Sequence, residues 1–182
     1  MLKINTIFYS SQETGYNAGM KAIIVCMSGC NKKCWFCNTK QHIKINEYLV
    51  SKNLKTELLK YSPSTRVMFT GGEPLLQKDN ILMFIRNYPE YTYYLETNGT
   101  IALTEEEFKL FTWVTVSPKD DEIPILLFKG FCHEIKIVWT GVEDLDLYEN
   151  FTQVKYLCSC SELNNEMQTR REACNRHQAW RY

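Results

Sequence analysis

The sequence predicts an α/β fold in which helices lie outside a parallel sheet. Short apolar segments alternate with longer segments of helical periodicity, and small polar motifs follow several of the apolar segments. Each helix in such a pattern returns the chain to the start of the next parallel strand. The chain has 182 residues. About six strand-helix units fit this length, so we expect an abbreviated, partial (βα)6-type barrel instead of a closed eightfold one.

The first third of the chain contains two predicted strands and one predicted helix. Residues 4–9 favour a strand, and the polar segment 10–19 favours a loop. Residues 21–27 (KAIIVCM) are apolar and β-branched, which is typical of a buried strand. Apolar residues recur at roughly helical spacing over residues 46–61, and Pro63 ends that pattern.

The rest of the chain continues the alternation and then ends in a polar tail. We expect strands and helices in turn, with strands at residues 66–70, 91–95, 111–116, 134–139 and 154–158 and helices at 75–88 and 104–111. Thr104 and Glu107 have the spacing of a capping box at a helix start. Residues 134–139 (EIKIVW) alternate polar and apolar side chains, as a half-buried strand does. We expect the tail, residues 158–182, to be helical.

The composition predicts a single domain over residues 1–182, because no linker rich in Pro, Gly or Ser divides the chain. Its 21 basic and 21 acidic residues cancel, which gives no support for binding to nucleic acid or to an anionic membrane. No segment is long and apolar enough to span a bilayer, so we expect a soluble, cytoplasmic protein. Eight cysteines in such a chain indicate metal ligation more than a disulfide framework.

The most specific feature of the sequence is the cysteine loop, residues 29–39 (GCNKKCWFCNT), which follows the second predicted strand. Cys30, Cys34 and Cys37 are separated by three and then two residues, so their thiolates fit one metal centre. Three thiolates without an obvious fourth favour an iron-sulfur cluster with one iron open to an exogenous ligand. A structural zinc site with His42 as its fourth ligand is the alternative, and it stays open at this point.

Three further predicted strands end in small polar motifs, which a parallel sheet would bring to one edge. In GGEP (residues 71–74), the glycines let a ligand approach the backbone and Glu73 offers a carboxylate to an ammonium group. In ETNGT (residues 96–100), two acceptors and a donor suit sugar hydroxyls. In SPK (residues 117–119), the serine and lysine are able to hold a carboxylate. The simpler alternatives are glycine turns and solvated strand ends.

In combination these residues resemble the radical S-adenosylmethionine (SAM) superfamily, whose three-cysteine cluster binds SAM at its fourth iron. CNKKCWFC followed by GGEP carries that resemblance. More narrowly, IFYSSQETG, GCNKKCWFCNT, TGGEPLLQ, ETNGT and VSPK, in this order, resemble the 7-carboxy-7-deazaguanine synthase family of deazapurine and queuosine-precursor biosynthesis. These motifs span residues 7–119, and the later KIVW segment also fits the family.

The resemblance implies a lyase that converts 6-carboxy-5,6,7,8-tetrahydropterin to 7-carboxy-7-deazaguanine with loss of ammonia. In this family, reductive cleavage of SAM gives methionine and a 5′-deoxyadenosyl radical, which abstracts hydrogen from the pterin. The implied cofactors are a [4Fe-4S] cluster, SAM and Mg²⁺. The implied partners are flavodoxin or ferredoxin as the electron donor and a second copy of the chain in a homodimer.

Site residues follow from the positions that match the family motifs. The resemblance assigns the cluster to Cys30, Cys34 and Cys37, and magnesium to the hydroxyl of Thr39. The residues implied at SAM are Phe36, Gly72, Glu73, Glu96, Asn98, Ser117 and Lys119. Gly72 and Glu73 are implied at the SAM amino group, and Ser117 and Lys119 near its carboxylate. Glu96 and Asn98 are implied near the SAM ribose or the substrate. The residues implied at the pterin-like substrate are Gln12, Thr14, Thr70 and Gly71.

Several positions depart from the family pattern where the substrate is expected. The family's Gln-Gly-Glu-Gly loop reads QETG at residues 12–15, so its acid is displaced. The arginine expected four residues before the first cluster cysteine is Cys26, and a thiol cannot grip a carboxylate as an arginine does. Asn38 replaces the usual aspartate after the last cluster cysteine. The final segment RHQAWRY has no clear family match, and its His177 is a candidate substitute.

These departures leave two alternatives open. One is a radical SAM enzyme with a different substrate, for example a glycyl-radical activase-like protein. The other is a homologue that binds the cluster or a partner protein without turnover. The tail has two interpretations of its own: it forms a second metal site, or its cysteines are spare thiols that bind no metal. The residues concerned are Cys158, Cys160, Cys174 and His177.

Overall fold

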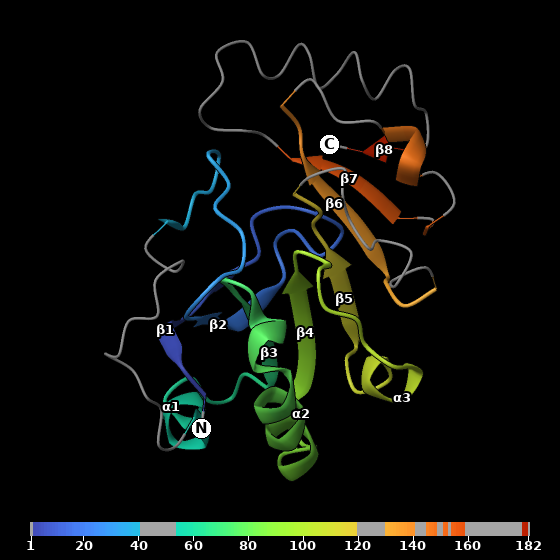
Figure 1. The fold of residues 1–182 in the computed structure, drawn as a ribbon. Helices are drawn as coiled ribbons and strands as arrows, with labels where there is room; N and C mark the ends of the chain where they lie inside the picture. Colours follow the sequence, from blue (N-terminus) through green and yellow to red (C-terminus); the bar gives the residue numbers. More distant parts are fainter. Residues whose placement is uncertain are drawn as a thin grey trace.

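The structure is a computed structural model of the 182-residue chain, and it describes residues 2–40, 54–119, 130–140, 145–148, 151–152, 154–158 and 180–181 (Figure 1). The described strands are β1 (Ile4–Ser11), β2 (Lys21–Met27), β3 (Arg66–Gly71), β4 (Thr92–Thr97), β5 (Trp113–Val116), β6 (Glu134–Val138), β7 (Val154–Cys158) and β8 (Trp180–Arg181). The described helices are α1 (Leu54–Leu59), α2 (Lys78–Asn87) and α3 (Glu105–Phe108), with 3-10 turns η3 (Pro74–Gln77) and η5 (Leu145–Tyr148).

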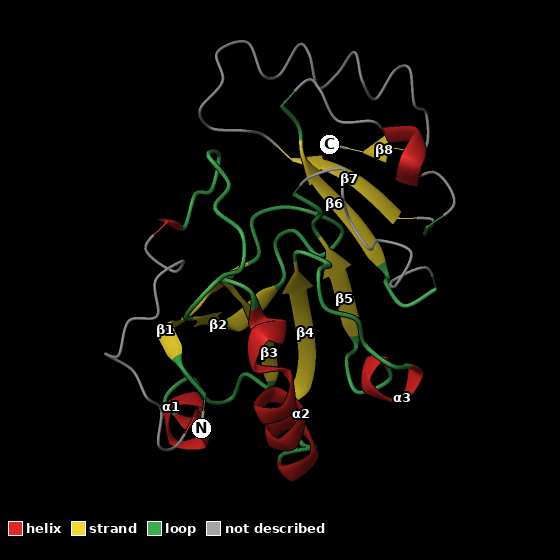
Figure 2. Cartoon of the chain, viewed as in Figure 1, coloured by secondary structure: helices red, strands yellow, loops and turns green. Residues whose placement is uncertain are grey.

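The strands lie in the sheet in the order in which they occur in the chain, from β1 to β8. β1 pairs antiparallel with β2, and every later pair of neighbours is parallel. The helices α1, α2 and α3 connect successive parallel strands (Figure 2). Sequential parallel strands with helices on one face are the arrangement of a (βα) barrel, and β1 and β8 leave this one open at its two edges. The predicted α/β fold with a partial barrel is confirmed.

The face of the sheet that carries the helices is the main apolar core. Val25, Phe69 and Val116 of three parallel strands are buried there against Leu58 of α1 and Ile81 of α2. None of these five side chains has exposed surface. Because successive side chains of a strand point to opposite faces, the alternate residues of the same strands lie inside the barrel.

The inner face of the sheet changes from apolar to polar along the strands. Ile24, Met68 and Tyr94 pack together in a small apolar cluster on this face. The strand register then places a row of mostly polar residues, here called the polar row, across five adjacent strands: Cys26, Thr70, Glu96, Thr115 and Glu134. The interior therefore becomes hydrophilic toward the carboxyl ends of the parallel strands. This end of the barrel is here called the rim.

Two helices differ from their predicted extents. The segment predicted as one helix over residues 75–88 begins with η3, whose tight turn starts at Pro74 and is capped by the Glu73 side chain, and then continues as α2. The capping box at the start of α3 is confirmed, because Thr104 Oγ1 accepts from Glu107 N–H and Glu107 Oε2 accepts from Thr104 N–H. This helix ends at Phe108, and β5 accordingly starts later than predicted.

Some predictions lie partly outside the described residues. Helix α1 is the described end of the helix predicted over residues 46–61, and residues 46–53 lie outside. The predicted helical tail also lies outside, except at Trp180–Arg181, where β8 pairs with β7 and corrects the prediction. The single domain over residues 1–182 stays a prediction. No helix in the part of the chain that the structure describes is long and apolar enough to cross a membrane.

Candidate active site

The cysteine loop begins where β2 ends, at the rim (Figure 1). Cys30, Cys34 and Cys37 are partly exposed free thiols. The Cys37 N–H donates to Cys34 O at 3.2 Å, and the Lys32 N–H donates to Cys30 Sγ at 3.4 Å. Burial raises the pKa of the Cys30 thiol, although the bond from Lys32 acts against it. Iron bound at this loop would favour the thiolate form that ligation requires.

The three thiols fit a cluster better than a single ion. Within the described residues, no group of three or more His, Cys, Asp or Glu side chains is arranged to hold one metal ion, as a structural zinc site requires. In a cluster the cysteines bind different irons, so they stand around the cluster and need not converge on one point. His42, the fourth ligand of the zinc alternative, lies outside the described residues.

The GGEP motif holds the start of the cysteine loop through main-chain hydrogen bonds. The Gly72 N–H donates to Met27 O at 3.0 Å, and the Glu73 N–H donates to Gly29 O at 2.8 Å. Gly71, the last residue of β3, has a φ of +105°, and a Cβ atom there would lie 2.6 Å from Met27 N. Strands β2 and β3 therefore approach each other too closely at this point for any residue except glycine.

The Glu73 carboxylate has no exposed surface and accepts three hydrogen bonds. Its Oε1 accepts from the Leu75 N–H at 2.9 Å and from the Thr97 hydroxyl at 2.7 Å, and its Oε2 accepts from the Asn98 N–H at 2.7 Å. Burial raises the pKa of Glu73, and these hydrogen bonds act in the opposite direction. Glu73 thus connects the ends of β3 and β4. Its predicted contact with the SAM amino group stays a prediction.

We expect Glu73→Gln to lower the free energy of unfolding by about 1–3 kcal/mol, because the amide NH₂ would face a donor that the carboxylate now accepts. Urea denaturation of the apo protein measures the change. Glu105→Gln is the control, because the Glu105 side chain is 59% exposed, and it should have a much smaller effect. Equal losses in the two variants would contradict the connecting role of Glu73.

The ETNGT motif contacts the cysteine loop through its asparagine. Asn98 Nδ2 donates to Asn31 Oδ1 at 2.9 Å, and Asn31 Nδ2 donates to Thr100 Oγ1 at 2.8 Å. Asn98 Oδ1 in turn accepts from the Thr100 hydroxyl at 2.7 Å. Asn98 is thus tied to the cysteine loop, and its predicted place near the SAM ribose stays a prediction. Sequence reasoning missed Asn31, because 67 positions separate it from Asn98.

The serine and lysine of the SPK motif follow β5 at the rim. The Ser117 N–H donates to Thr97 O at 2.8 Å, and Lys119 Nζ donates to Ser117 Oγ at 2.7 Å. Burial lowers the pKa of Lys119, and the charge of Cys34 in its thiolate form acts against that shift. An ammonium group close to the cysteine loop suits the predicted contact with the SAM carboxylate, which stays a prediction.

Phe36 and Thr39 belong to the cysteine loop itself. The Thr39 hydroxyl donates to Gly71 O at 3.5 Å and lies 3.6 Å from Cys37 Sγ. Hydroxyl oxygen is a ligand that suits Mg²⁺. The partly buried Phe36 ring packs edge to face against Trp35, with 5.4 Å between the ring centroids. The contacts of Thr39 with magnesium and of Phe36 with SAM stay predictions.

The residues predicted at the substrate meet around one carboxylate inside the barrel. Gln12 Nε2 donates to Thr14 O at 3.0 Å and to Glu96 Oε1 at 3.5 Å. The Thr70 hydroxyl donates to Glu96 Oε2 at 3.0 Å, and Gly71 follows it at the end of β3. The loop after β1 and the strands β3 and β4 thus bring these five residues together, and their contact with substrate stays a prediction.

Two charged residues of β6 complete this interior, and sequence reasoning missed both. Lys136 forms an ion pair with Glu96 Oε1. Glu134 Oε2 accepts from the Thr115 hydroxyl at 2.9 Å, and its Oε1 accepts from the Tyr16 N–H at 3.0 Å. The alternating EIKIVW segment contained the signal, because charges on a parallel strand covered on both faces need partners.

The ion pair keeps both of its members charged. Burial acts to raise the pKa of Glu96, but the Lys136 ammonium and the hydrogen bonds from Lys136 and Thr70 outweigh it and hold that pKa below its usual value. Burial acts to lower the pKa of Lys136, and the Glu96 carboxylate outweighs it, so that this pKa is raised. At neutral pH the interior therefore contains a fixed carboxylate and a fixed ammonium group.

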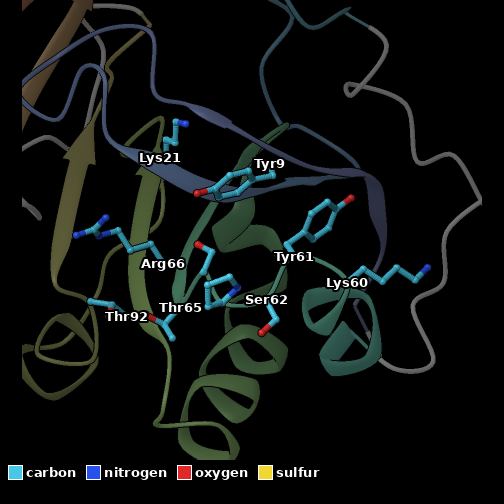
Figure 3. Close-up of a pocket in the computed structure, with 10 residues that line it drawn as sticks. Tyr9, Lys21, Lys60, Tyr61, Ser62, Thr65, Arg66 and Thr92 are labelled. Carbon is cyan, nitrogen blue, oxygen red and sulfur yellow. The ribbon is translucent and has the colours of Figure 1, made fainter.

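A separate cavity of about 630 Å³ lies at the other end of the sheet (Figure 3). Its lining includes Lys21, Arg66 and Thr92, which are the first residues of β2, β3 and β4. The stacked rings of Tyr9 and Tyr61 form another part of its wall. The cavity is therefore at the amino ends of the parallel strands, away from the cysteine loop at the rim.

Comparison with known proteins gives the class of this site. Residues 24–119 match the model of the radical SAM superfamily. They include the cysteine loop and the GGEP, ETNGT and SPK motifs, which the fold brings together at the rim. The chain is thus a radical SAM enzyme, of a class that uses a [4Fe-4S] cluster and SAM.

Two relatives and one solved structure narrow the assignment. The chain is 37% identical to 7-carboxy-7-deazaguanine synthase from Bacteroides thetaiotaomicron, over 100% of this chain and 93% of that one. It is 30% identical to the Thermoplasma acidophilum protein of the same name, over 81% of this chain and 75% of that one. The chain belongs to the 7-carboxy-7-deazaguanine synthase family. The crystal structure of QueE from Escherichia coli shares the fold, with a TM-score of 0.71, 22% identity and coverage of 99% and 92% of the two chains.

Proposed function

We propose that the protein converts 6-carboxy-5,6,7,8-tetrahydropterin to 7-carboxy-7-deazaguanine, with loss of ammonia, by radical SAM chemistry. The observation that carries the proposal is the joining of the motif loops around the cysteine loop. GGEP bonds to Gly29, ETNGT bonds to Asn31, and the lysine of SPK interacts electrostatically with Cys34. The relatives are 7-carboxy-7-deazaguanine synthases, and their name supplies the product. A glycyl-radical activase is not favoured by these relatives.

The chain's own residues provide the positions that this chemistry needs. When bound, the cluster and SAM supply an electron and a radical that removes hydrogen from the substrate. Cys30, Cys34 and Cys37 would hold the cluster through their thiolates. The Lys119 ammonium and the Ser117 hydroxyl, which are already hydrogen-bonded to each other, bind the SAM carboxylate. Gly72 and Glu73 fix the loop that faces the SAM amino group.

The polar interior of the barrel suits the rest of the substrate. Gln12 is 7% exposed, and its Oε1 has no hydrogen-bond partner among the residues that the structure describes. An unpaired buried acceptor is costly unless a ligand satisfies it, and a pterin ring carries several N–H donors. The same group of residues includes Thr14, whose carbonyl oxygen accepts from Gln12 Nε2, and Thr70, whose hydroxyl donates to Glu96.

Further parts of the proposal concern the partners and the setting. Thr39 offers a hydroxyl oxygen for Mg²⁺ at the edge of the cysteine loop. We propose flavodoxin or ferredoxin as the electron donor, because the cluster needs one electron in each cycle.

A homodimer is supported by the exposed Phe8 and Tyr9 rings on the edge strand β1. The six described cysteines are all free thiols, which supports a reducing cytoplasm.

An anaerobic assay tests the function directly. Reconstituted protein is incubated with reductant, SAM, magnesium and 6-carboxytetrahydropterin, and the products are followed by mass spectrometry. We expect 5′-deoxyadenosine and 7-carboxy-7-deazaguanine, each dependent on the pterin. Formation of 5′-deoxyadenosine without the deazapurine would mean another substrate. An intact cluster with neither product would indicate a homologue without turnover.

A further inference from the structure

We propose that Lys136 binds the carboxylate of the substrate, in the role for which the family pattern has an arginine at the position of Cys26. The inference rests on the proposed function, because its ligand is the carboxylated pterin. Lys136 is the first residue of the KIVW segment, to which the family resemblance gives no role, and here it is assigned as a residue that determines specificity.

The position of Lys136 gives its ammonium group access to the interior. Lys136 is on β6, two residues nearer the rim than Glu134 of the polar row. Its side chain is 11% exposed, and the Glu96 side chain with which it pairs is 21% exposed. The ion pair is therefore largely desolvated, yet a ligand is able to reach it. Charged hydrogen bonds are strongest in such surroundings.

Cys26 lies in the polar row, on the same inner face of the sheet as Glu96, but it brings no charge there. Strand pairing sets Cys26 beside Thr70, whose hydroxyl bonds to Glu96, the partner of Lys136. Burial and the nearby Glu96 carboxylate raise the pKa of the Cys26 thiol to about 11, so this side chain is neutral at physiological pH. Cys26 is on β2 and Lys136 is on β6. An arginine in place of Cys26 would thus reach the polar row from the β2 end, whereas Lys136 reaches it from the β6 end.

Other cations in the described part of the chain are placed elsewhere. The arginines there, Arg66, Arg86 and Arg181, are all exposed. Lys119 is bonded to Ser117 at the rim, where the proposed function uses it for SAM. Among the described residues, Lys136 is thus the cation that forms an ion pair with the polar row, through Glu96.

The hydrogen-bonding capacity of Lys136 supports a ligand at this place. An ammonium group has three donors, and within the described residues Glu96 Oε1 is the one acceptor that Lys136 contacts. The described part of the chain therefore leaves two donors of Lys136 unused, which is enough for a second carboxylate. Gln12 Oε1, the unpaired buried acceptor, belongs to a side chain that bonds to the same Glu96. The group of Gln12, Glu96 and Lys136 offers donors for a carboxylate and an acceptor for a ring N–H.

Binding of two pterins tests the inference. Affinities for 6-carboxytetrahydropterin and for tetrahydropterin, which lacks the carboxylate, are measured with cluster-reconstituted, SAM-loaded protein in the absence of reductant. We expect Lys136→Met to weaken binding of the carboxylated pterin by about 10- to 100-fold, the range for a charged hydrogen bond. Binding of tetrahydropterin should stay within about twofold, because it has no group for the ammonium. The double variant Cys26→Arg/Lys136→Met should bind the carboxylated pterin at least about tenfold more tightly than Lys136→Met does.

Two further variants control for general damage. Lys155→Met removes another buried lysine, 5% exposed, whose register neighbour Ile135 belongs to the helix-side core, and it should leave the preference for the carboxylated pterin unchanged. Glu96→Gln/Lys136→Gln removes both charges together, so no lone buried carboxylate is left to unfold the protein. We expect this double variant to lose the preference as Lys136→Met does. Iron content and circular dichroism confirm that each variant is folded.

The outcomes separate the inference from the proposed function. If Lys136→Met keeps the wild-type preference for the carboxylated pterin, or weakens both pterins equally, Lys136 does not recognise the carboxylate. If the wild-type protein binds both pterins equally well, carboxylate recognition itself is absent. If it binds neither pterin although SAM binds, the proposed function fails as well.

Discussion

Cys34→Ala is expected to abolish both the bound cluster and the cleavage of SAM. Cys34 is the central member of the three-cysteine set, and its main chain accepts the hydrogen bond that shapes the loop toward Cys37. Two thiolates leave two irons of the cluster without protein ligands, so the cluster should not persist. Iron and sulfide per chain, visible absorbance and anaerobic formation of 5′-deoxyadenosine measure the loss, which should approach the detection limit.

Cys132→Ala is the matched control for this loss. Cys132 is also a free thiol, but it is 8% exposed, belongs to the helix-side core, and has its pKa raised to about 12 by burial. A buried neutral thiol is a poor ligand, so this variant should keep its full cluster and lose only some packing energy. Full iron and sulfide occupancy in Cys34→Ala would remove that cysteine from the ligand set.

Gly71→Ala should lower the free energy of unfolding by about 2–5 kcal/mol, since it combines a left-handed backbone with a steric clash. The new Cβ atom would lie 2.6 Å from Met27 N and 2.8 Å from Cys26 Cα, both main-chain atoms that no side-chain rotation can move. Relief requires β2 and β3 to separate, which would also strain the bond from the Gly72 N–H to Met27 O. Urea denaturation of the apo protein measures the effect.

Gly19→Ala isolates the backbone part of this effect. Gly19 also has a left-handed φ, +84°, but no atom lies within 4 Å of a Cβ added there. We therefore expect a loss of about 1–2 kcal/mol, from backbone strain alone. Similar losses at Gly19 and Gly71 would show that β2 and β3 have room to adjust at the rim.

Local sequence patterns were sufficient to predict most of the strands and the place of the site in the fold. Residues 21–27 and 154–158 form strands with the predicted bounds, because their apolar, β-branched side chains suit a covered sheet. The motifs after β3, β4 and β5 meet at the rim because parallel strands end on the same side. The capping box at Thr104 is a local interaction, and it was predictable for that reason.

Contacts between distant residues could not be predicted in the same way. Glu96 and Lys136 are 40 positions apart, and their pairing depends on the intervening strand β5 and on the register of the sheet. The short strand β8 has no sequence signal of its own, because two residues gain their structure only from pairing with β7. The Glu73 carboxylate looked like a ligand for a cation, yet its hydrogen bonds to β4 and η3 emerge only from the fold.

The sequential order of the strands also bears on how the protein is assembled during translation. The hydrogen bonds that anchor the cysteine loop come from Gly72, Glu73, Asn98 and Thr100. All four residues precede β5, β6 and β7 in the chain, so the segment that holds the cysteine loop leaves the ribosome before those strands do. The strand that carries Lys136 therefore emerges after the segment that holds the cysteine loop. The order of the chain thus permits iron loading before the substrate chamber is complete.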